Sequence, residues 1–219
     1  MPEQQTQTEE RRVLAASNIE VRADGEKNRI AGYAAVFDSQ SEDLGGFREI
    51  IKRNAFKAAL EEKQPVSARI QHEGGLTTIG TTESGTLRLK EDGHGLYYEI
   101  DVPDTSAGRD IMTLVRSGII NKSSFAFTVR PDGEAWDLGG DYPIRQLTNL
   151  NLHDVAPVDG PAYQATSVSV RDKAQAMIEA ARADKEHQVE IPEARVKTIQ
   201  DSYYESMRAQ FPEVRRKPI

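Results

Sequence analysis

Between residues 14 and 170 the chain alternates apolar and polar positions in short runs, and Gly, Asp and Asn separate these runs. Alternation with a period of two predicts strands that bury one of their faces. The clearest runs are Ile30 to Phe37, Val66 to Gln71, Leu87 to Leu89, Leu96 to Val102, Ser124 to Val129, Tyr142 to Leu147 and Asn151 to Val155. The hydrophobic pattern therefore predicts about seven short strands in this part of the chain.

Two segments between these runs carry apolar residues at helical spacing. The first is Asn54 to Lys63. The second follows Asp104 or Thr105, either of which suits a helix N-cap, and it ends before Gly118. Its apolar stripe consists of Ala107, Ile111, Leu114 and Val115. Short strands with two covering helices predict an α+β fold, in the form of a compact, mixed β-barrel with helical cover.

The composition changes near the C-terminus. The last 49 residues carry ten Lys or Arg and nine Asp or Glu. Ala-rich stretches at Lys173 to Lys185 and at about Glu193 to Ala209 predict helices that are solvated or dock on a partner. The predicted organisation is a disordered N-terminal tail (residues 1–13), a β-barrel domain (residues 14–170) and a charged helical C-terminal extension (residues 171–219).

The chain is polar and acidic, with 37% hydrophobic residues, 29% charged residues and a formal net charge of −7. Because binding to a phosphate backbone needs clustered positive charge, we expect no nucleic-acid partner. The polar N-terminus lacks the apolar region of a secretory signal, and no apolar run reaches the roughly 18 residues of a membrane span. We therefore expect a soluble protein with no membrane partner.

The supply of ligating side chains argues against a metal centre. The chain has no Cys and only four His, which are His72, His94, His153 and His187. No HExxH pattern, phosphate-binding loop or dinucleotide fingerprint occurs. We expect no metal ion and no cofactor. The lack of Cys also excludes disulfides and a cysteine nucleophile, and it fits a reducing cytoplasm.

Among the histidines, His72 has the most suggestive position. It follows the apolar run SARIQ and precedes the turn sequence Glu73-Gly74-Gly75. This places an imidazole at the rim of a sheet, where active-site groups are commonly displayed. Taken alone, a polar residue that ends a strand is the simpler interpretation.

Ser124 opens the strand SFAFTV directly after the second predicted helix. A serine in this position can expose its hydroxyl while the following aromatic residues anchor the backbone. Serine is also common where a helix joins a strand, and the adjacent Ser123 is a second candidate. A nucleophilic serine is recognised by geometry rather than by local sequence, so the local pattern leaves both residues open.

Asp154 lies in a predicted strand among apolar residues, Leu150, Leu152 and Val155. A carboxylate in such surroundings needs a partner, and an imidazolium is a natural one, although a cap on the turn that follows is an alternative. Its neighbour His153 is a rival. Because successive side chains of a strand point to opposite faces, at most one of the two readily faces a common site.

The order of these segments resembles the prohead (capsid-maturation) proteases of tailed phages, the HK97-like proteases related in fold to the herpesvirus assemblins. The resemblance covers about residues 18 to 170. It is carried by the segments GYAAVFD, NAFKAAL, SARIQHEGG, DTSAGRDIMTLVRSGIINKSSFAF and LHDVAPVDGPAYQAT. In that family a His follows a core strand, a Ser opens an aromatic strand after a helix, and an acidic residue precedes a turn of the form V-[SA]-P-V.

Carried to this sequence, the resemblance implies His72, Ser124 and Asp154 as catalytic residues, with Ser124 as the nucleophile. The chain has Ser123 where the family usually has Met, Ala126 where it usually has Gly, and Asp rather than the commoner Glu at position 154. Assemblins use a second His as the third member, so His153 remains the alternative to Asp154.

The resemblance implies a serine endopeptidase that cleaves the scaffolding segment of the major capsid protein, and also itself, during capsid assembly. It implies action in the host cytoplasm inside the immature prohead, with the portal as a further candidate partner. Because assemblins are activated by dimerisation, it is also consistent with a homodimer. The sequence does not assign the oxyanion hole: backbone amides near the site or an Arg can supply it, and Arg130 and Arg145 are the arginine candidates.

Three other functions compete with this interpretation. The first is a non-catalytic capsid scaffold or assembly protein with the same barrel. The second is another serine hydrolase such as an esterase, although the chain has no G-x-S-x-G elbow. The third is a barrel that binds a small molecule.

Overall fold

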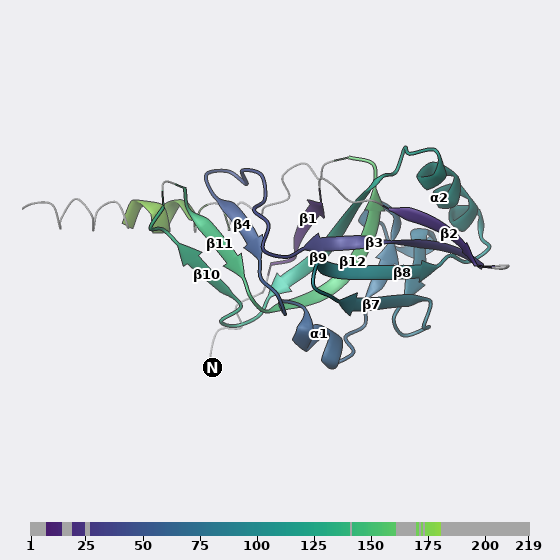
Figure 1. Cartoon of the computed structure of the whole chain (residues 1–219), viewed down its shortest axis with the longest axis horizontal. Helices are drawn as coiled ribbons and strands as arrows, with labels where there is room; N and C mark the ends of the chain where they lie inside the picture. The colour runs from purple at the N-terminus through teal and green to yellow at the C-terminus, as the bar shows by residue number, and fades with distance from the viewer. Residues whose placement is uncertain are drawn as a thin grey trace, which may run out of the picture. The chain divides into compact units, whose positions relative to one another are not determined.

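The structure is a computed structural model, and its described residues contain three β-sheets and few helices (Figure 1). The described residues are 8–14, 19–24, 27–140, 142–160, 170, 172 and 174–180. Within them are twelve strands, the α-helices α1 and α2, and a helical segment at residues 174–180. The chain divides into two compact units, residues 1–175 and 176–219, and only residues 176–180 of the second are described.

The largest sheet has five strands. Their order is β1 (Glu10–Leu14), β9 (Lys122–Val129), β12 (Leu150–Val158), β5 (Ser67–Arg69) and β6 (Thr78–Thr81). Strand β9 is antiparallel to both of its neighbours, β1 and β12, whereas β12 runs parallel to β5. This sheet therefore has β1 and β6 as its edges.

The other two sheets have four and three strands. The four-stranded, antiparallel sheet has the order β2 (Glu20–Asp24), β3 (Lys27–Val36), β8 (Gly95–Asp101) and β7 (Leu87–Glu91). The three-stranded sheet has the order β10 (Glu134–Asp137), β11 (Ile144–Leu147) and β4 (Arg48–Ile51), with β11 and β4 parallel.

Two helices cover these sheets. Helix α1 (Lys57–Glu61) packs on β12 and β7, and α2 (Ser106–Arg116) packs near β2 (Figure 1). Thr105 is the N-cap of α2, because its hydroxyl accepts a hydrogen bond from the Gly108 amide at 3.0 Å. Gly118, with a φ of +74°, follows the end of the helix. The predicted cap and stop of this helix are confirmed.

The main core fills the space between the five-stranded and four-stranded sheets and the helices. Its largest fully buried members include Tyr98, Phe56, Phe125, Phe127, Ile30, Ile79, Leu96, Ile100, Ile111, Leu147 and Leu150. A smaller cluster joins Phe47 to Val170 and Ala174, with Leu44 and Trp136 against it. Aromatic contacts tie β9 into the main core, since Phe125 packs edge-on against Phe56 and stacks on Phe127.

The sequence predicted the α+β class correctly and the barrel wrongly. All seven predicted strands occur, but five more strands accompany them, namely β1, β2, β4, β6 and β10. A barrel needs its first and last strands to pair with each other. In the described part of the chain β1 and β6 remain edges, so the sheets do not close.

The N-terminal end of the domain also differs from the prediction, whereas the described C-terminal residues agree with it. Residues 10–13, assigned to a disordered tail, form strand β1 because β9 supplies a pairing partner. Residues 174–180 of the predicted helix Lys173 to Lys185 are helical. The stretch from Glu193 to Ala209 lies outside the described residues, and no described helix is long and apolar enough to cross a membrane.

Candidate active site

Ser124 lies near the start of β9, the strand between β1 and β12 in the five-stranded sheet. Its side chain is fully buried, as is that of the preceding Ser123. The two hydroxyls have different partners, because neighbouring side chains of a strand point to opposite faces. The Ser123 Oγ lies 2.8 Å from the hydroxyl of Tyr98, whereas the Ser124 Oγ lies 2.6 Å from the His72 Nε2.

His72 stands on a tight turn rather than at the end of a strand. Strand β5 ends at Arg69, and the turn η1 (Ile70–His72) is closed by a 2.9 Å hydrogen bond from the Glu73 amide to the Ile70 carbonyl. Both central residues have positive φ, +54° at Gln71 and +62° at His72, as in a type I′ turn. Residues other than Gly rarely adopt this conformation, and such backbone strain clusters at functional sites.

Asp154 lies on β12, beside β9, and is 1% exposed. The pairing of the two strands shifts by one residue between Leu152 and Asp154, which is a β-bulge at His153. The Asp154 Oδ1 lies 2.6 Å from the His72 Nδ1. The His153 Nε2 instead lies 3.2 Å from the Thr128 hydroxyl.

The structure therefore brings the three predicted residues together in one buried chain of contacts. It runs from the Asp154 carboxylate through the His72 imidazole to the Ser124 hydroxyl. A carboxylate on Nδ1 fixes the imidazole tautomer that leaves Nε2 free to accept the hydroxyl proton. This arrangement is the one by which serine hydrolases activate their nucleophile.

One known protein family matches most of the chain. The profile of the family described as caudovirus prohead serine protease matches residues 17–180. The chain belongs to this family. The name of this family indicates a serine peptidase that acts in the phage prohead.

A search of solved structures finds a similar protein from bacteriophage T4, the capsid assembly protease gp21. The match has a TM-score of 0.38 and 13% sequence identity, and it covers 69% of this chain and 99% of the other. A likeness this distant identifies no residue roles. No curated protein matches the chain.

A cation also lies beside Asp154. The Arg69 Nη1 lies 3.5 Å from the Asp154 Oδ2, the oxygen that does not contact His72. Arg69 stands at the end of β5, three residues before His72, and its side chain is 37% exposed. No pattern in the sequence marks Arg69 as a site residue, although its place in the run SARIQH puts it near His72.

The two arginines proposed for the oxyanion hole have other partners. Arg130 binds the carboxylate of Glu62 through both terminal nitrogens, at 2.8 and 2.5 Å. Arg145 is buried and binds Glu10, Glu49 and Glu134. Neither contacts Ser124 through a hydrogen bond described here, so the structure does not support either one as an oxyanion donor.

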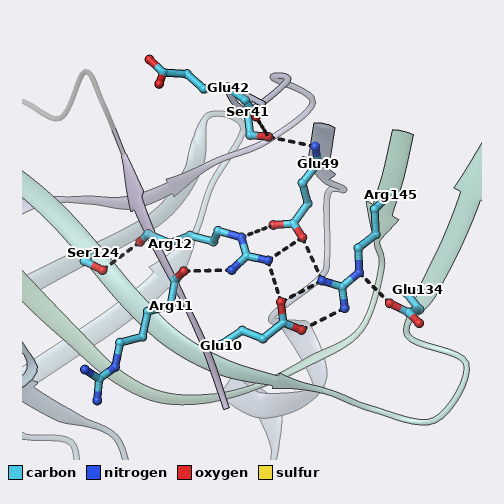
Figure 2. A network of polar contacts seen from close by, with 9 residues as sticks. All are labelled: Glu10, Arg11, Arg12, Ser41, Glu42, Glu49, Ser124, Glu134 and Arg145. Atoms are coloured by element: carbon cyan, nitrogen blue, oxygen red, sulfur yellow. Dashed lines mark hydrogen bonds and ion pairs between the residues drawn. The ribbon is translucent and has the colours of Figure 1, made fainter. Parts of the chain in front are cut away.

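A buried network of charges adjoins the site (Figure 2). Arg145 and Arg12 both bind Glu10 and Glu49. Burial by itself raises the pKa of Glu10, but the bonds to Arg145 and the charge of Arg12 outweigh it, and the pKa falls below its ordinary value. Burial likewise lowers the pKa of Arg12, and Glu49 and Glu10 more than restore it.

The N-terminal strand brings this network to Ser124. Val13 pairs with Ser124 across β1 and β9, and the Arg12 carbonyl oxygen lies 2.9 Å from the Ser124 Oγ. This contact could not be predicted from the sequence, because ERRVL contains no apolar alternation that would indicate a strand. Only the pairing with β9 reveals it.

Proposed function

We propose that the chain is a serine endopeptidase in which Ser124 is the nucleophile, His72 the general base and acid, and Asp154 the residue that orients His72. The observation that carries this proposal is the pair of 2.6 Å contacts that link the three side chains. A serine hydroxyl is a weak nucleophile at neutral pH, and such a chain supplies the base it needs.

In the first half of the reaction, the Ser124 Oγ attacks the carbonyl carbon of a peptide bond and its proton passes to the His72 Nε2. The carbon–nitrogen bond then breaks, and the leaving amine takes that proton. In the second half, water loses a proton to His72 and hydrolyses the acyl-enzyme, and Ser124 regains its proton. Asp154 stabilises the imidazolium that forms in each half.

The proposed substrates are the scaffolding segment of the major capsid protein and the chain's own C-terminal extension, residues 171–219. The support is membership of a prohead protease family together with the abrupt change to a charged sequence near residue 170. The proposed place of action is inside the immature prohead in the host cytoplasm. Other prohead proteins such as the portal, and a second copy of the chain, are proposed partners on the same basis.

The test uses the full chain, expressed alone and together with the capsid protein. Intact-mass spectrometry follows both polypeptides, and a fluorophosphonate probe reports whether a serine is nucleophilic. We expect cleavage and labelling of Ser124 in the wild type and neither in Ser124→Ala. If a folded wild-type chain shows no Ser124-dependent cleavage and no labelling, the protein is a non-catalytic assembly factor instead.

A further inference from the structure

Strand β1 occupies the edge of β9 at the point where Ser124 lies. The two strands are antiparallel, with Arg12 paired with Phe125 and Val13 with Ser124. The Arg12 carbonyl oxygen is 2.9 Å from the Ser124 Oγ. The chain thus presents one of its own peptide carbonyls to the proposed nucleophile.

This contact is an unproductive one. The Ser124 hydroxyl has one proton, and in this arrangement it donates that proton to the Arg12 carbonyl oxygen. A carbonyl that accepts a hydrogen bond from the nucleophile turns its oxygen toward it, whereas attack requires the carbon. The same hydrogen bond also competes with donation to the His72 Nε2, 2.6 Å away.

The side chain of Arg12 is received by a buried carboxylate. Its Nε lies 2.7 Å from the Glu49 Oε1, and its Nη2 lies 2.9 Å from the Glu49 Oε2. The guanidinium also lies over the ring of Phe127, 5.2 Å from the ring centre. A forked pair of bonds to a buried carboxylate, with an aromatic face beside it, is specific for Arg.

Two residues earlier, the side chain of Glu10 is received by a buried guanidinium. The Arg145 Nη1 lies 2.8 Å from one oxygen of Glu10, and the Nη2 lies 2.9 Å from the other. Arg11, between the two, points away from the network (Figure 2). Its guanidinium pairs with the exposed carboxylate of Glu9. Strand pairing with pockets for alternate side chains is a recurrent mode of peptide recognition.

We propose that the edge of β9 occupied by β1 is the substrate groove of the protease and that β1 fills it as an internal pseudo-substrate. Glu49 and Arg145 are then the specificity-determining residues. Glu49 binds the Arg before the cleaved bond, and Arg145 binds the Glu two residues earlier. The substrate class is an extended polypeptide with the sequence Glu-x-Arg, cleaved after Arg. This inference rests on the proposed function and adds its specificity.

One edge accepts one strand, so β1 must leave before a substrate enters. Its departure separates Glu10 and Arg12 from the network, while Arg145 keeps Glu49 and Glu134 as partners. The empty groove therefore leaves fewer buried charges unpaired than it would if Arg12 were the sole partner of Glu49. The exchange of β1 for a substrate strand with the same charges is then close to neutral in free energy.

The sequence contains a second copy of the β1 pattern. Glu two residues before Arg occurs at residues 9–11, 10–12, 20–22, 193–195 and 213–215, and Val follows the Arg only at 10–13 and 193–196. Residues 193–196 belong to the extension whose removal is proposed above. We expect self-cleavage between Arg195 and Val196: an ester forms between Ser124 and Arg195, the amine of Val196 leaves with a proton, and water releases Arg195 as a carboxylate.

The first experiment loosens β1 in the full-length protein. Arg12→Ala removes the groups that bind Glu49, and Arg11→Ala is the matched control because Arg11 lies on the same strand but faces solvent. The readout is the rate at which a fluorophosphonate labels Ser124. We expect Arg12→Ala to raise this rate on the order of tenfold or more, the effect of losing one or two charge-assisted hydrogen bonds, with no change in Arg11→Ala.

The second experiment tests specificity with a synthetic peptide of residues 189–200 and the wild-type, full-length enzyme. Changing Arg195→Ala or Glu193→Ala in the peptide should lower kcat/KM on the order of tenfold or more, because each removes one or two charge-assisted hydrogen bonds to the groove. The control is Ala194→Lys, at the position that corresponds to the exposed Arg11. In the enzyme, Glu49→Gln should reduce the preference for Arg195 over Ala, and it nearly preserves the shape of the side chain.

The outcomes separate the two proposals. If Ser124 is labelled and the peptide is cut, yet the Arg195→Ala and Glu193→Ala peptides are cut equally well, the groove proposal is wrong and the proposed function stands. Equal labelling of the wild type and of a folded Arg12→Ala would also overturn the pseudo-substrate role of β1. If no variant labels or cleaves, the proposed function fails first. Should Arg12→Ala not fold, the peptide series with the wild type still decides the specificity.

Discussion

The hydroxyls of Ser123 and Ser124, adjacent on β9, serve different faces of the sheet. The Ser123 Oγ lies 2.8 Å from the hydroxyl of the fully buried Tyr98, and the Ser124 Oγ lies 2.6 Å from the His72 Nε2. Burial raises the pKa of Tyr98 above its ordinary value, so its hydroxyl stays protonated and needs a hydrogen-bond partner.

This relationship predicts opposite effects for two alanine substitutions. Ser124→Ala should abolish peptide cleavage and change the free energy of unfolding by only about 1 kcal/mol. Ser123→Ala should keep cleavage and destabilise the fold by about 1–3 kcal/mol, because the buried Tyr98 hydroxyl loses its partner. Urea unfolding and a peptide-cleavage assay on both variants measure this. If Ser124→Ala still cleaves while a folded Ser123→Ala does not, Ser123 rather than Ser124 is the nucleophile.

Asp154 and His153 are also adjacent, and the β-bulge between β9 and β12 directs only Asp154 to His72. Asp154→Asn should lower kcat on the order of 10⁴-fold, because an amide no longer holds the productive tautomer of the imidazole. His153→Ala should lower it by less than about tenfold, since it removes only a contact with Thr128. Steady-state kinetics on both decide the third member. An inactive His153→Ala beside an active Asp154→Asn would reverse the assignment.

The turn that carries His72 predicts an effect of backbone conformation. Gln71 has a φ of +54°, a region that Asn tolerates and that β-branched residues avoid. Gln71→Val should destabilise the fold by about 1–2 kcal/mol and lower kcat, because relief of the strain moves His72. Gln71→Asn should change the stability of the fold by less than about 0.5 kcal/mol and kcat by less than about twofold. Thermal unfolding and kinetics on the two variants provide the check, and equal behaviour of Val and Asn would exclude a role for the turn.

Glu10 predicts how the docking of β1 depends on pH. Its carboxylate faces Arg12 and Arg145, shares both with Glu49, and has a pKa below the ordinary value of 4.5. A lowered pKa in the docked state means that Glu10 stabilises docking fully above about pH 4.5 and loses this contribution as the pH falls through the docked-state pKa.

Hydrogen exchange of the amides of residues 10–14, corrected for the intrinsic effect of pH, measures this docking. We expect protection to fall in the wild type as the pH drops below about 4.5, and to be lower with less pH dependence in Glu10→Gln. Glu9, whose side chain is exposed, supplies the control Glu9→Gln. If Glu10→Gln and Glu9→Gln have the same pH profile, Glu10 does not govern the docking.

Local patterns in the sequence were sufficient for much of the fold. Alternation predicted the strands that hold Ser124 and Asp154, and helical spacing with a Thr105 cap and Gly118 predicted α2. These signals lie within about ten residues of one another, and they follow from the period of a strand or a helix. The short strands β1 and β4 were not predicted because half or more of their residues are charged and their partner strands are remote in sequence.

The sequence also determined which residues could form the site, but not how they meet. The order of a His after a strand, a Ser before aromatics and an Asp before V-A-P-V named His72, Ser124 and Asp154. Choosing Ser124 over Ser123 as the partner of His72, and Asp154 over His153, required the faces of β9 and the bulge on β12. The contact of Arg12 with Ser124 joins residues 112 positions apart. Such pairings depend on the register of strands that tertiary packing brings together, and no local period encodes them.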